Sequence, residues 1–327
     1  MEGRPDPPGR DSSMNFTLIP EEAPSESLRR IAVEQIEGAV TQLQRSDDLN
    51  EGIHEARKHF KRVRALLRLA RGALPEETYV SENMHFRDLG RLLSPVRDSA
   101  VYIETLDQIR KSSRALIPEE AFLHLRTRLE TEHRAVLNAY AQDDQRQKSL
   151  IASLKSAQSR VYSWRFNESE FSLFKAGLRR IYARGRDERA AAYSQPTTER
   201  FHAWRKRVKY LWYHLQILQP LWPAQLKAME RECDRLADLL GDEHDLAVLM
   251  ETPSLKELLA VHSAGAQVLH LTVSRERERQ RRAAIPLAQR IYGESAGRFV
   301  ARIEEYWIAY RPLSQFLPQE AVPRVDR

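Results

Sequence analysis

Two segments of this chain, about 150 residues apart, carry basic side chains in the same order. Each begins with a histidine, followed by arginine at +3, lysine at +4 and lysine at +7: His54, Arg57, Lys58 and Lys61 in the first, and His202, Arg205, Lys206 and Lys209 in the second. On an α-helix, which turns by about 100° per residue, these offsets fall on one face. Arginine offers forked donors to phosphate oxygens and lysine a compact charge, so the pattern predicts binding of a repeating polyanion.

The charged face of the first segment extends beyond the shared motif, because Arg64 and Arg68 continue it. Apolar side chains such as Phe60 occupy the opposite side, which predicts a helix with one buried and one cationic face. Only Glu51 and Glu55 lie nearby, and like charges at i,i+4 spacing destabilise a helix. A solvated face is the simplest explanation of a single basic helix, but the duplication favours a functional anion site.

The second segment carries less charge and more aromatic surface. Three of its side chains stand where the first segment has Arg64, Ala65 and Arg68, namely Trp212, Tyr213 and Gln216. The helix predicted just before it carries basic and aromatic residues on one face: Lys175, Arg179, Tyr182, Arg186 and Arg189. If this helix packs beside the His202 helix, the two form a basic wall; a plain solvated face is the alternative.

A further match follows each basic segment, over residues 89–105 and 236–252. It aligns Arg97 with His244 and Asp98 with Asp245. Such a long period indicates a duplicated subdomain rather than a solenoid repeat. Arg97 and His244 are therefore site candidates of lower rank, and we expect the two aspartates to pair with basic residues of neighbouring helices.

Other chemistry finds little support in the sequence. The acidic residues at 242–245 follow Gly241, so we expect them to begin a helix and interact with its dipole, not to bind a metal. The chain has no glycine-rich phosphate loop and no nucleophile elbow. The sequence therefore predicts no catalytic residue, no metal, no cofactor and no enzymatic activity.

Composition and periodicity predict a soluble, cytoplasmic, all-α protein. The 52 basic and 46 acidic residues leave a net charge of +6, and the single cysteine, Cys233, fits a reducing compartment. No secretory signal is found, and no apolar run approaches the roughly 18 residues of a membrane span. Apolar residues recur every three or four positions, which predicts helices at residues 25–46, 50–72, 78–111, 117–144, 147–160, 168–192, 198–219, 223–240, 242–250, 253–265 and 268–311, the last bent at Pro286.

These helices are expected to form two related bundles. The predicted organisation is a disordered leader at 1–21, an N-terminal bundle at 22–160, a C-terminal bundle at 161–311 and a tail at 312–327.

The paired H-x-x-R-K-x-x-K helices, each followed by a leucine-rich segment ending in R/H-D, resemble the CHAD family, the conserved histidine α-helical domain. The resemblance spans residues 22–311 and implies two pseudo-symmetric antiparallel helical bundles around a basic central cavity. It also implies binding of inorganic polyphosphate and association with polyphosphate granules. Carried over by position, the phosphate-contacting residues are His54, Arg57, Lys58, Lys61, Arg64, His202, Arg205, Lys206 and Lys209, together with Arg179 and Arg186. No signature of the CYTH domain is found, so the chain resembles a stand-alone member.

The predicted partners are therefore polyphosphate and granule-associated proteins, without a membrane. Nucleic acid is not the expected partner, because surface aromatics accompany the stripes only at Trp212 and Tyr213. Two alternatives stay open, an accessory to a triphosphate- or polyphosphate-processing enzyme and a nucleic-acid-binding protein. The protonation of His54 and His202 is also open: a bound polyanion would favour the charged form, whereas a helix-orienting role needs the neutral one.

Overall fold

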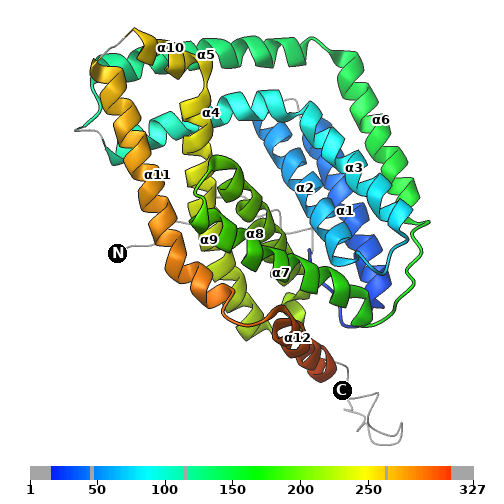
Figure 1. The fold of residues 1–327 in the computed structure, drawn as a ribbon. Coiled ribbons are helices and arrows are strands. Elements are labelled where there is room, and N and C mark those ends of the chain that lie inside the picture. Colours follow the sequence, from blue (N-terminus) through cyan, green and yellow to red (C-terminus); the bar gives the residue numbers. More distant parts are fainter. Residues whose placement is uncertain (1–15, 45–47, 114–115, 262–263, 311–327) are drawn as a thin grey trace, which may run out of the picture.

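The computed structural model describes residues 16–44, 48–113, 116–261 and 264–310. Over these residues the chain forms twelve α-helices and one short 3₁₀ helix, with no β-strand (Figure 1). The prediction of an all-α fold is confirmed.

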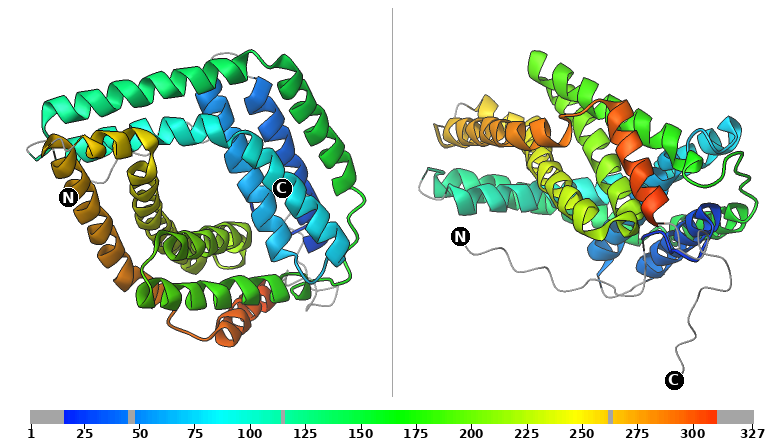
Figure 2. Two further views of the ribbon diagram at one scale, coloured as in Figure 1. Left: turned by 45° about the horizontal axis from the view of Figure 1, so that its top comes forward. Right: turned by 90° about the horizontal axis from the view of Figure 1, so that it is seen from below.

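The helices of the predicted N-terminal half are α1 (Pro24–Gln44), α2 (Leu49–Leu69), α3 (Glu76–Leu92), α4 (Ser94–Ser112), α5 (Glu119–Ala141) and α6 (Asp144–Val161). Those of the C-terminal half are α7 (Ser172–Ser194), α8 (Thr198–Leu218), η1 (Gln219–Leu221), α9 (Pro223–Glu251), α10 (Pro253–Ala260), α11 (Ala264–Ile291) and α12 (Ala296–Tyr310). In the left view of Figure 2, α5, α6, α7 and α11 outline the molecule around α4, α8 and α9.

The repeated second element takes different forms in the two halves. The helix predicted at 78–111 is divided at Leu93 into α3 and α4, with Pro95 in the first turn of α4, where its missing N–H costs nothing. The aligned part of the second half carries Asp242 in place of Pro95, and α9 runs through it without a break. Our prediction of a helix end at residue 240 was therefore wrong, and Gly241 is buried within α9.

The predicted C-terminal helix is also two helices. α11 continues past Pro286, which is exposed, and ends at Ile291. The chain then turns before α12 begins at Ala296. We had placed a bend at Pro286 inside one helix of residues 268–311, so the position of the break was wrong.

Two hydrophobic cores hold the helices together, and each takes side chains from both predicted halves. The larger core unites α1, α2, α3 and α6 with α7, α8, α12 and the nearby parts of α9 and α11. The smaller core joins α4 and α5 to α9, α10 and α11 through residues such as Leu106, Leu125 and Leu249. The halves are therefore packed into one another and do not have separate cores.

The ordered part of the chain begins before residue 22, inside the predicted leader. Phe16 and Leu18 are buried in the larger core, and the Leu18 N–H donates to the carbonyl of Ile217 at 3.0 Å. The prediction of disorder was therefore wrong for residues 16–21. Residues 1–15 and the predicted tail at 312–327 lie outside the described residues.

The two basic helices, α2 and α8, are fixed against each other. The buried His214 ring on α8 lies 2.9 Å from the carbonyl oxygen of Ala65 on α2, measured from Nε2. At Gly177, α7 meets the C-terminal end of α2 so closely that an added Cβ would stand 2.1 Å from the Leu69 carbonyl oxygen. This glycine lets the backbones of α7 and α2 approach each other.

Candidate functional site

Both basic helices begin with a side-chain cap a short distance before the motif histidine. Asp48 accepts a hydrogen bond from the Glu51 N–H at the start of α2, and Thr197 accepts one from the Arg200 N–H at the start of α8. Such caps satisfy N–H groups that have no partner within the helix. The motif therefore occupies the second to fourth turns of both helices.

The apolar face of each helix holds the basic face outward. On α2, Phe60 and Val63 are buried, and on α8 the fully buried residues include Trp204 and Val208. This is the anchoring face expected from the sequence.

The two stripes meet around one lysine. Lys61 is exposed to solvent, yet its pKa is lowered to about 7, first by desolvation from the surrounding protein and then by positive charges. Those charges belong to Arg205 and Lys209 of α8, Arg57 of α2 and Arg97 of α4. We call these five side chains the central basic cluster. Its members come from both copies of the motif.

Three basic side chains of the two stripes are in direct contact with no carboxylate among the described residues, although Asp245 acts electrostatically on Lys61 and Arg205. Lys61, Arg205 and Lys206 make no hydrogen bond and no ion pair with any residue that the structure describes. The Arg205 Nε is buried, and the guanidinium lies within 4 Å of where a Cβ on Gly241 would be. An added Cβ at this point of α9 would be in ordinary van der Waals contact with Arg205.

One lysine of the α2 stripe has a local counter-ion. The Lys58 ammonium donates to Glu55 at 2.6 Å, and the same carboxylate lies 3.9 Å from His54 Nε2. Glu55 is one of the two acidic residues that the sequence places near the stripe. Lys58 is available to an anion only in competition with Glu55.

Two arginines of the central basic cluster are held by α4. Arg57 donates to the Ser94 hydroxyl at 2.6 Å and lies 3.7 Å from Asp98. Arg97 makes a two-pronged pair with Glu104, at 2.6 and 2.9 Å. The predicted pairing of Asp98 with a basic residue of a neighbouring helix is confirmed. These contacts fix the orientation of both guanidinium groups.

Arg64 and Arg68 lie at the other end of the stripe, against α3 and α8. Both donate to the side-chain oxygen of Asn83, at 3.3 and 2.7 Å. The Arg68 guanidinium also stands over the Tyr210 ring, 4.2 Å from its centroid. Lys206 and Arg64 act electrostatically on each other, so this end again joins the two copies. The motif did not identify Asn83 or Tyr210, although Tyr210 directly follows Lys209.

The motif histidines are neutral in the free protein. Burial, followed by nearby positive charges, lowers the pKa of His54 to about 3, of His202 to about 4 and of His244 to about 3. The rings of His202 and His244 stack with centroids 4.2 Å apart. Each of these two has a buried Nδ1 without a hydrogen-bond partner among the described residues.

We expect these histidines to make the protein less stable in acid. Each imidazole binds a proton near its ordinary pKa of about 6.5 when unfolded, but only near 3 or 4 when folded. The unfolded state therefore holds more protons below about pH 6.5, and stability is lost as the pH falls toward 4. Urea unfolding at pH 7, 6 and 5 should give steadily lower midpoints. His244→Gln should reduce this slope by about one proton; midpoints independent of pH would contradict the assignment.

Arg179 and Arg186 do not join the stripes. They share a face of α7 with Tyr182, whose ring stacks on Phe299 of α12 with centroids 4.1 Å apart. Arg179 lines a cavity of about 850 Å³ that residues of α7 and α12 share. This face of α7 is therefore turned toward α12. α7 does pack beside α8, but its basic face does not form a wall with that helix.

The side of α7 that meets α8 carries a different set of charges. Glu188 lies between Arg184, at 3.7 Å, and Arg207 of α8, at 3.9 Å. Arg207 belongs to the second motif segment, but its offset places it off the stripe.

The acidic residues at 242–245 lie in the middle of α9, so our prediction that they begin a helix was wrong. Glu243 is fully buried and accepts hydrogen bonds from Arg277 and Arg281 of α11, at 2.9 and 2.7 Å. In the described part of the chain, no group of three or more His, Cys, Asp or Glu side chains is arranged to hold a metal ion. No helix described here is long and apolar enough to cross a membrane.

The all-helical fold and the two copies of the basic helix together define the class of this protein. The CHAD domain family model matches residues 30–254, so the chain belongs to the CHAD family. Among curated proteins, no match was found.

Two solved structures show a similar fold. PptA from Streptomyces chartreusis is 12% identical, with a TM-score of 0.57 over 84% of this chain and 100% of its own. The CHAD domain from the plant Ricinus communis is 18% identical, with a TM-score of 0.51 over 90% of this chain and 95% of its own. At these identities the likeness concerns the fold alone.

Proposed function

We propose that this protein binds inorganic polyphosphate through the central basic cluster and the adjoining side chains of α2 and α8. The observation that carries the proposal is the set of basic side chains that form no ion pair with a described residue, Lys61, Arg205 and Lys206, which come from both helices. Their mutual repulsion costs free energy in the unliganded protein, and a polyanion would remove that cost.

The spacing of the stripes suits a chain of phosphates. Basic residues one helical turn apart are separated by about 5.4 Å along the axis, so they can reach phosphates of an extended chain. Polyphosphate offers a charge on every phosphate and no bases, and neither stripe provides a series of stacking aromatic side chains. Because binding would release counterions, its affinity should fall steeply with salt, as it does for nucleic acids.

The surroundings of Lys61 support a concave site. Water reaches its side chain, yet enough protein surrounds it to lower its pKa to about 7. An ammonium group at the base of a recess would be both in contact with water and partly desolvated by protein. We therefore propose that the duplicated helices α2 and α8 line one basic cavity, in which the field of the cluster is concentrated.

We further propose that the protein acts by binding rather than by catalysis, in the cytoplasm, where it associates with polyphosphate granules and their proteins. The lone thiol offers no nucleophile to support catalysis, because burial raises the pKa of Cys233 above its ordinary range.

Competition binding tests the proposed ligand. Labelled long-chain polyphosphate is bound to the protein and challenged with unlabelled polyphosphate, duplex DNA, RNA or orthophosphate at equal phosphate concentration. We expect only polyphosphate to displace the label efficiently. Equal displacement by DNA or RNA would show a general polyanion binder, and phosphate release in the presence of Mg²⁺ would show an enzyme.

The pH dependence of binding should show whether the charged form of Lys61 contacts polyphosphate. Its pKa is about 7 in the free protein, and a bound polyanion would keep it charged at higher pH. Affinity for long polyphosphate should therefore be about tenfold lower at pH 8 than at pH 6. Lys61→Arg keeps the charge across this range and should flatten the profile. An unchanged profile in Lys61→Arg would show that another group takes up the proton.

A further inference from the structure

The side of α11 that faces solvent carries apolar and charged side chains in a regular order. In the left view of Figure 2, α11 forms one edge of the molecule. We call six exposed side chains on this side the outer face of α11: Val268, Leu271, Arg275, Glu278, Arg282 and Ile285. They follow one another in alternating steps of three and four residues, which keeps them within about 100° around the helix. The three aliphatic members are 37%, 56% and 37% exposed, in chain order.

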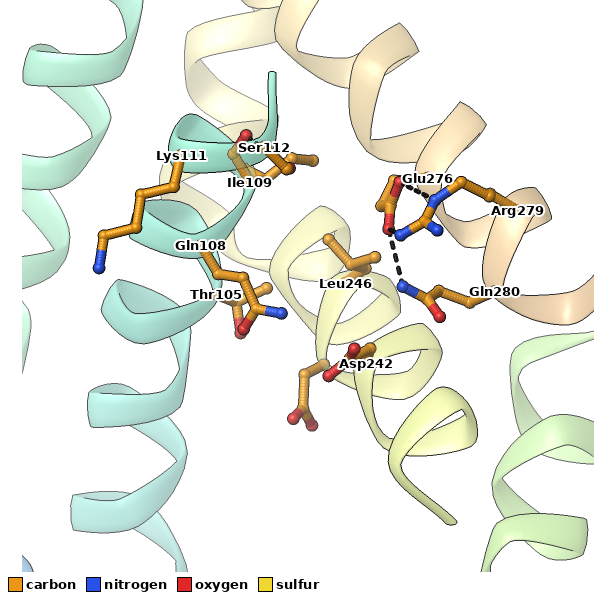
Figure 3. A pocket seen from close by; sticks show the side chains of 11 residues that line it. Thr105, Gln108, Ile109, Lys111, Ser112, Asp242, Leu246, Glu276, Arg279 and Gln280 are labelled. Atoms are coloured by element: carbon orange, nitrogen blue, oxygen red, sulfur yellow. Dashed lines mark hydrogen bonds and ion pairs between the residues drawn. The ribbon is translucent and has the colours of Figure 1, made fainter. Parts of the chain in front are cut away.

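The opposite side of α11 attaches the helix to its own chain. Leu269 and Val273 are buried in the smaller core. Glu276 and Gln280 line a cavity between α4, α9 and α11 (Figure 3), and no member of the outer face lines it. One apolar side is enough to hold a surface helix. Aliphatic residues aligned on a second side therefore indicate a surface that packs against another molecule.

The spacing on the outer face is that of a coiled coil. Steps of three and four residues place side chains on the seam along which two helices pack. α11 stays helical over the whole outer face and ends beyond it, at Ile291. The seam also contains charges, because Arg275, Glu278 and Arg282 lie between the aliphatic residues. A partner must therefore offer both charges and apolar groups at matching positions.

A second copy of α11, running in the opposite direction, offers that match. When Arg275 lies opposite Glu278 of the second copy, the reverse pair forms as well, as a twofold axis requires. In this register Val268 meets Ile285, because Val268 lies as many residues before Arg275 as Ile285 lies after Glu278. Leu271 meets the aliphatic stem of Arg282 for the same reason. Apolar groups and opposite charges therefore match in one and the same register.

The charges of the outer face are open to such a partner. Arg275 makes no hydrogen bond and no ion pair with any residue that the structure describes, whereas Glu278 pairs with Arg282 at 2.8 Å. A carboxylate has acceptor sites for two guanidinium groups, so Glu278 can keep Arg282 and also receive Arg275 of the second copy. Exposed pairs add little affinity, and we expect these charges to set direction and register.

We infer that this protein forms a homodimer in which two copies of α11 pack antiparallel through their outer faces. The same six residues of each chain form the contact, so the assembly is closed at two chains. One helix from each chain gives an interface at the small end of the range for specific contacts, roughly 1,200–2,000 Å². We therefore expect a dissociation constant in the micromolar range.

Sedimentation equilibrium of the full chain, without polyphosphate, tests the inference. Over concentrations from below to well above the micromolar range, we expect a reversible equilibrium between monomer and dimer. Leu271→Glu should weaken the dimer at least about tenfold, because it places a charge in the apolar part of the seam. The matched control is Met84→Glu, at an exposed apolar residue of α3, which should stay within about twofold of the wild type.

Exchange of charges tests the pairing itself. Arg275→Glu and Glu278→Arg should each weaken the dimer at least about tenfold, because each places like charges opposite each other twice. The double variant restores opposite charges and should return to within about threefold of the wild type. An effect of these residues on the helix alone would not give that recovery.

Cross-linking tests the direction of the two helices. Val268→Cys and Ile285→Cys, prepared as separate proteins, mixed and oxidised, should form a disulfide between one chain of each kind. Neither variant should cross-link with itself, because the two copies of position 268 would lie about 25 Å apart along the seam. The native Cys233 is buried and stays out of this reaction.

Several results would overturn the inference. They are a wild type that is monomeric at every concentration, a dimer that Leu271→Glu leaves intact, a double charge exchange without recovery, or single cysteine variants that cross-link with themselves. Circular dichroism must show that each variant is folded, and the charge exchange serves if Leu271→Glu is unstable. Since no polyphosphate is present, failure here leaves the proposed function untouched, and failure of polyphosphate binding leaves this test unaffected.

Discussion

Replacing both Lys61 and Arg205 by glutamate should weaken polyphosphate binding at low salt by at least about 100-fold. The two side chains come from different helices, act electrostatically on each other, and form no direct ion pair with a described residue. Each reversal removes an attraction to phosphate and adds a repulsion at the same point. Fluorescence anisotropy with end-labelled polyphosphate, at several salt concentrations, would measure the loss and the reduced salt dependence.

A matched variant separates this site from general charge. Lys155 of α6 and Lys227 of α9 are exposed, and their side chains form no ion pair with a described residue. Reversing both to glutamate changes the net charge by the same amount. We expect at most a severalfold loss of affinity from the long-range field. An equal loss in the two double variants would contradict a localised site.

Removing the carboxylate of Glu243 should cost about 3–5 kcal/mol of unfolding free energy. Glu243 is fully buried and receives hydrogen bonds from Arg277 and Arg281, which are themselves largely buried. Glu243→Ala would leave two guanidinium groups beside an empty space and without a counter-charge. Urea unfolding of wild type and variant would measure the difference.

The control for Glu243 is an exposed ion pair on the solvent face of α11. Glu278 and Arg282 are 2.8 Å apart at the surface, and Glu278→Ala should cost less than about 1 kcal/mol. Comparable stability of Glu243→Ala and the wild type would show that the network contributes little. The aligned position in the first half is Val96, which is buried, so one copy fills this place with an apolar side chain.

The sequence was sufficient to predict the two helices that carry the motif, together with their cationic faces. α2 and α8 follow from apolar periodicity and begin at capping residues, Asp48 and Thr197. Their cationic faces follow from the offsets alone, because the opposite faces contain the buried residues. The resemblance to the CHAD family is confirmed by the family match and the fold.

Other features depend on contacts between distant parts of the chain. The face of α7 with Arg179 looked equivalent to a stripe, but Tyr182 on that face packs against α12. Nor could the sequence distinguish free from paired cations, since Arg97 is held by Glu104 while Lys61 has no partner among the described residues. Sequence periodicity predicts which face of a helix a side chain lies on. It does not predict which other helix packs against that face.

The break between α3 and α4 has a local cause that is visible in the sequence. Pro95 begins a new helix in the first half, whereas Asp242 at the aligned place allows α9 to continue. The sequence prediction instead begins a new helix after Gly241, with the acidic residues in its first turn. Here that glycine is buried beside Arg205 within an uninterrupted helix.

Binding stoichiometry tests most directly whether the two stripes form one site. Calorimetry with a short polyphosphate of defined length should show one chain bound per protein. Lys61→Glu on α2 and Arg205→Glu on α8 should each weaken that same binding event. Two chains bound per protein, with each single reversal abolishing one and leaving the other at full affinity, would contradict the account.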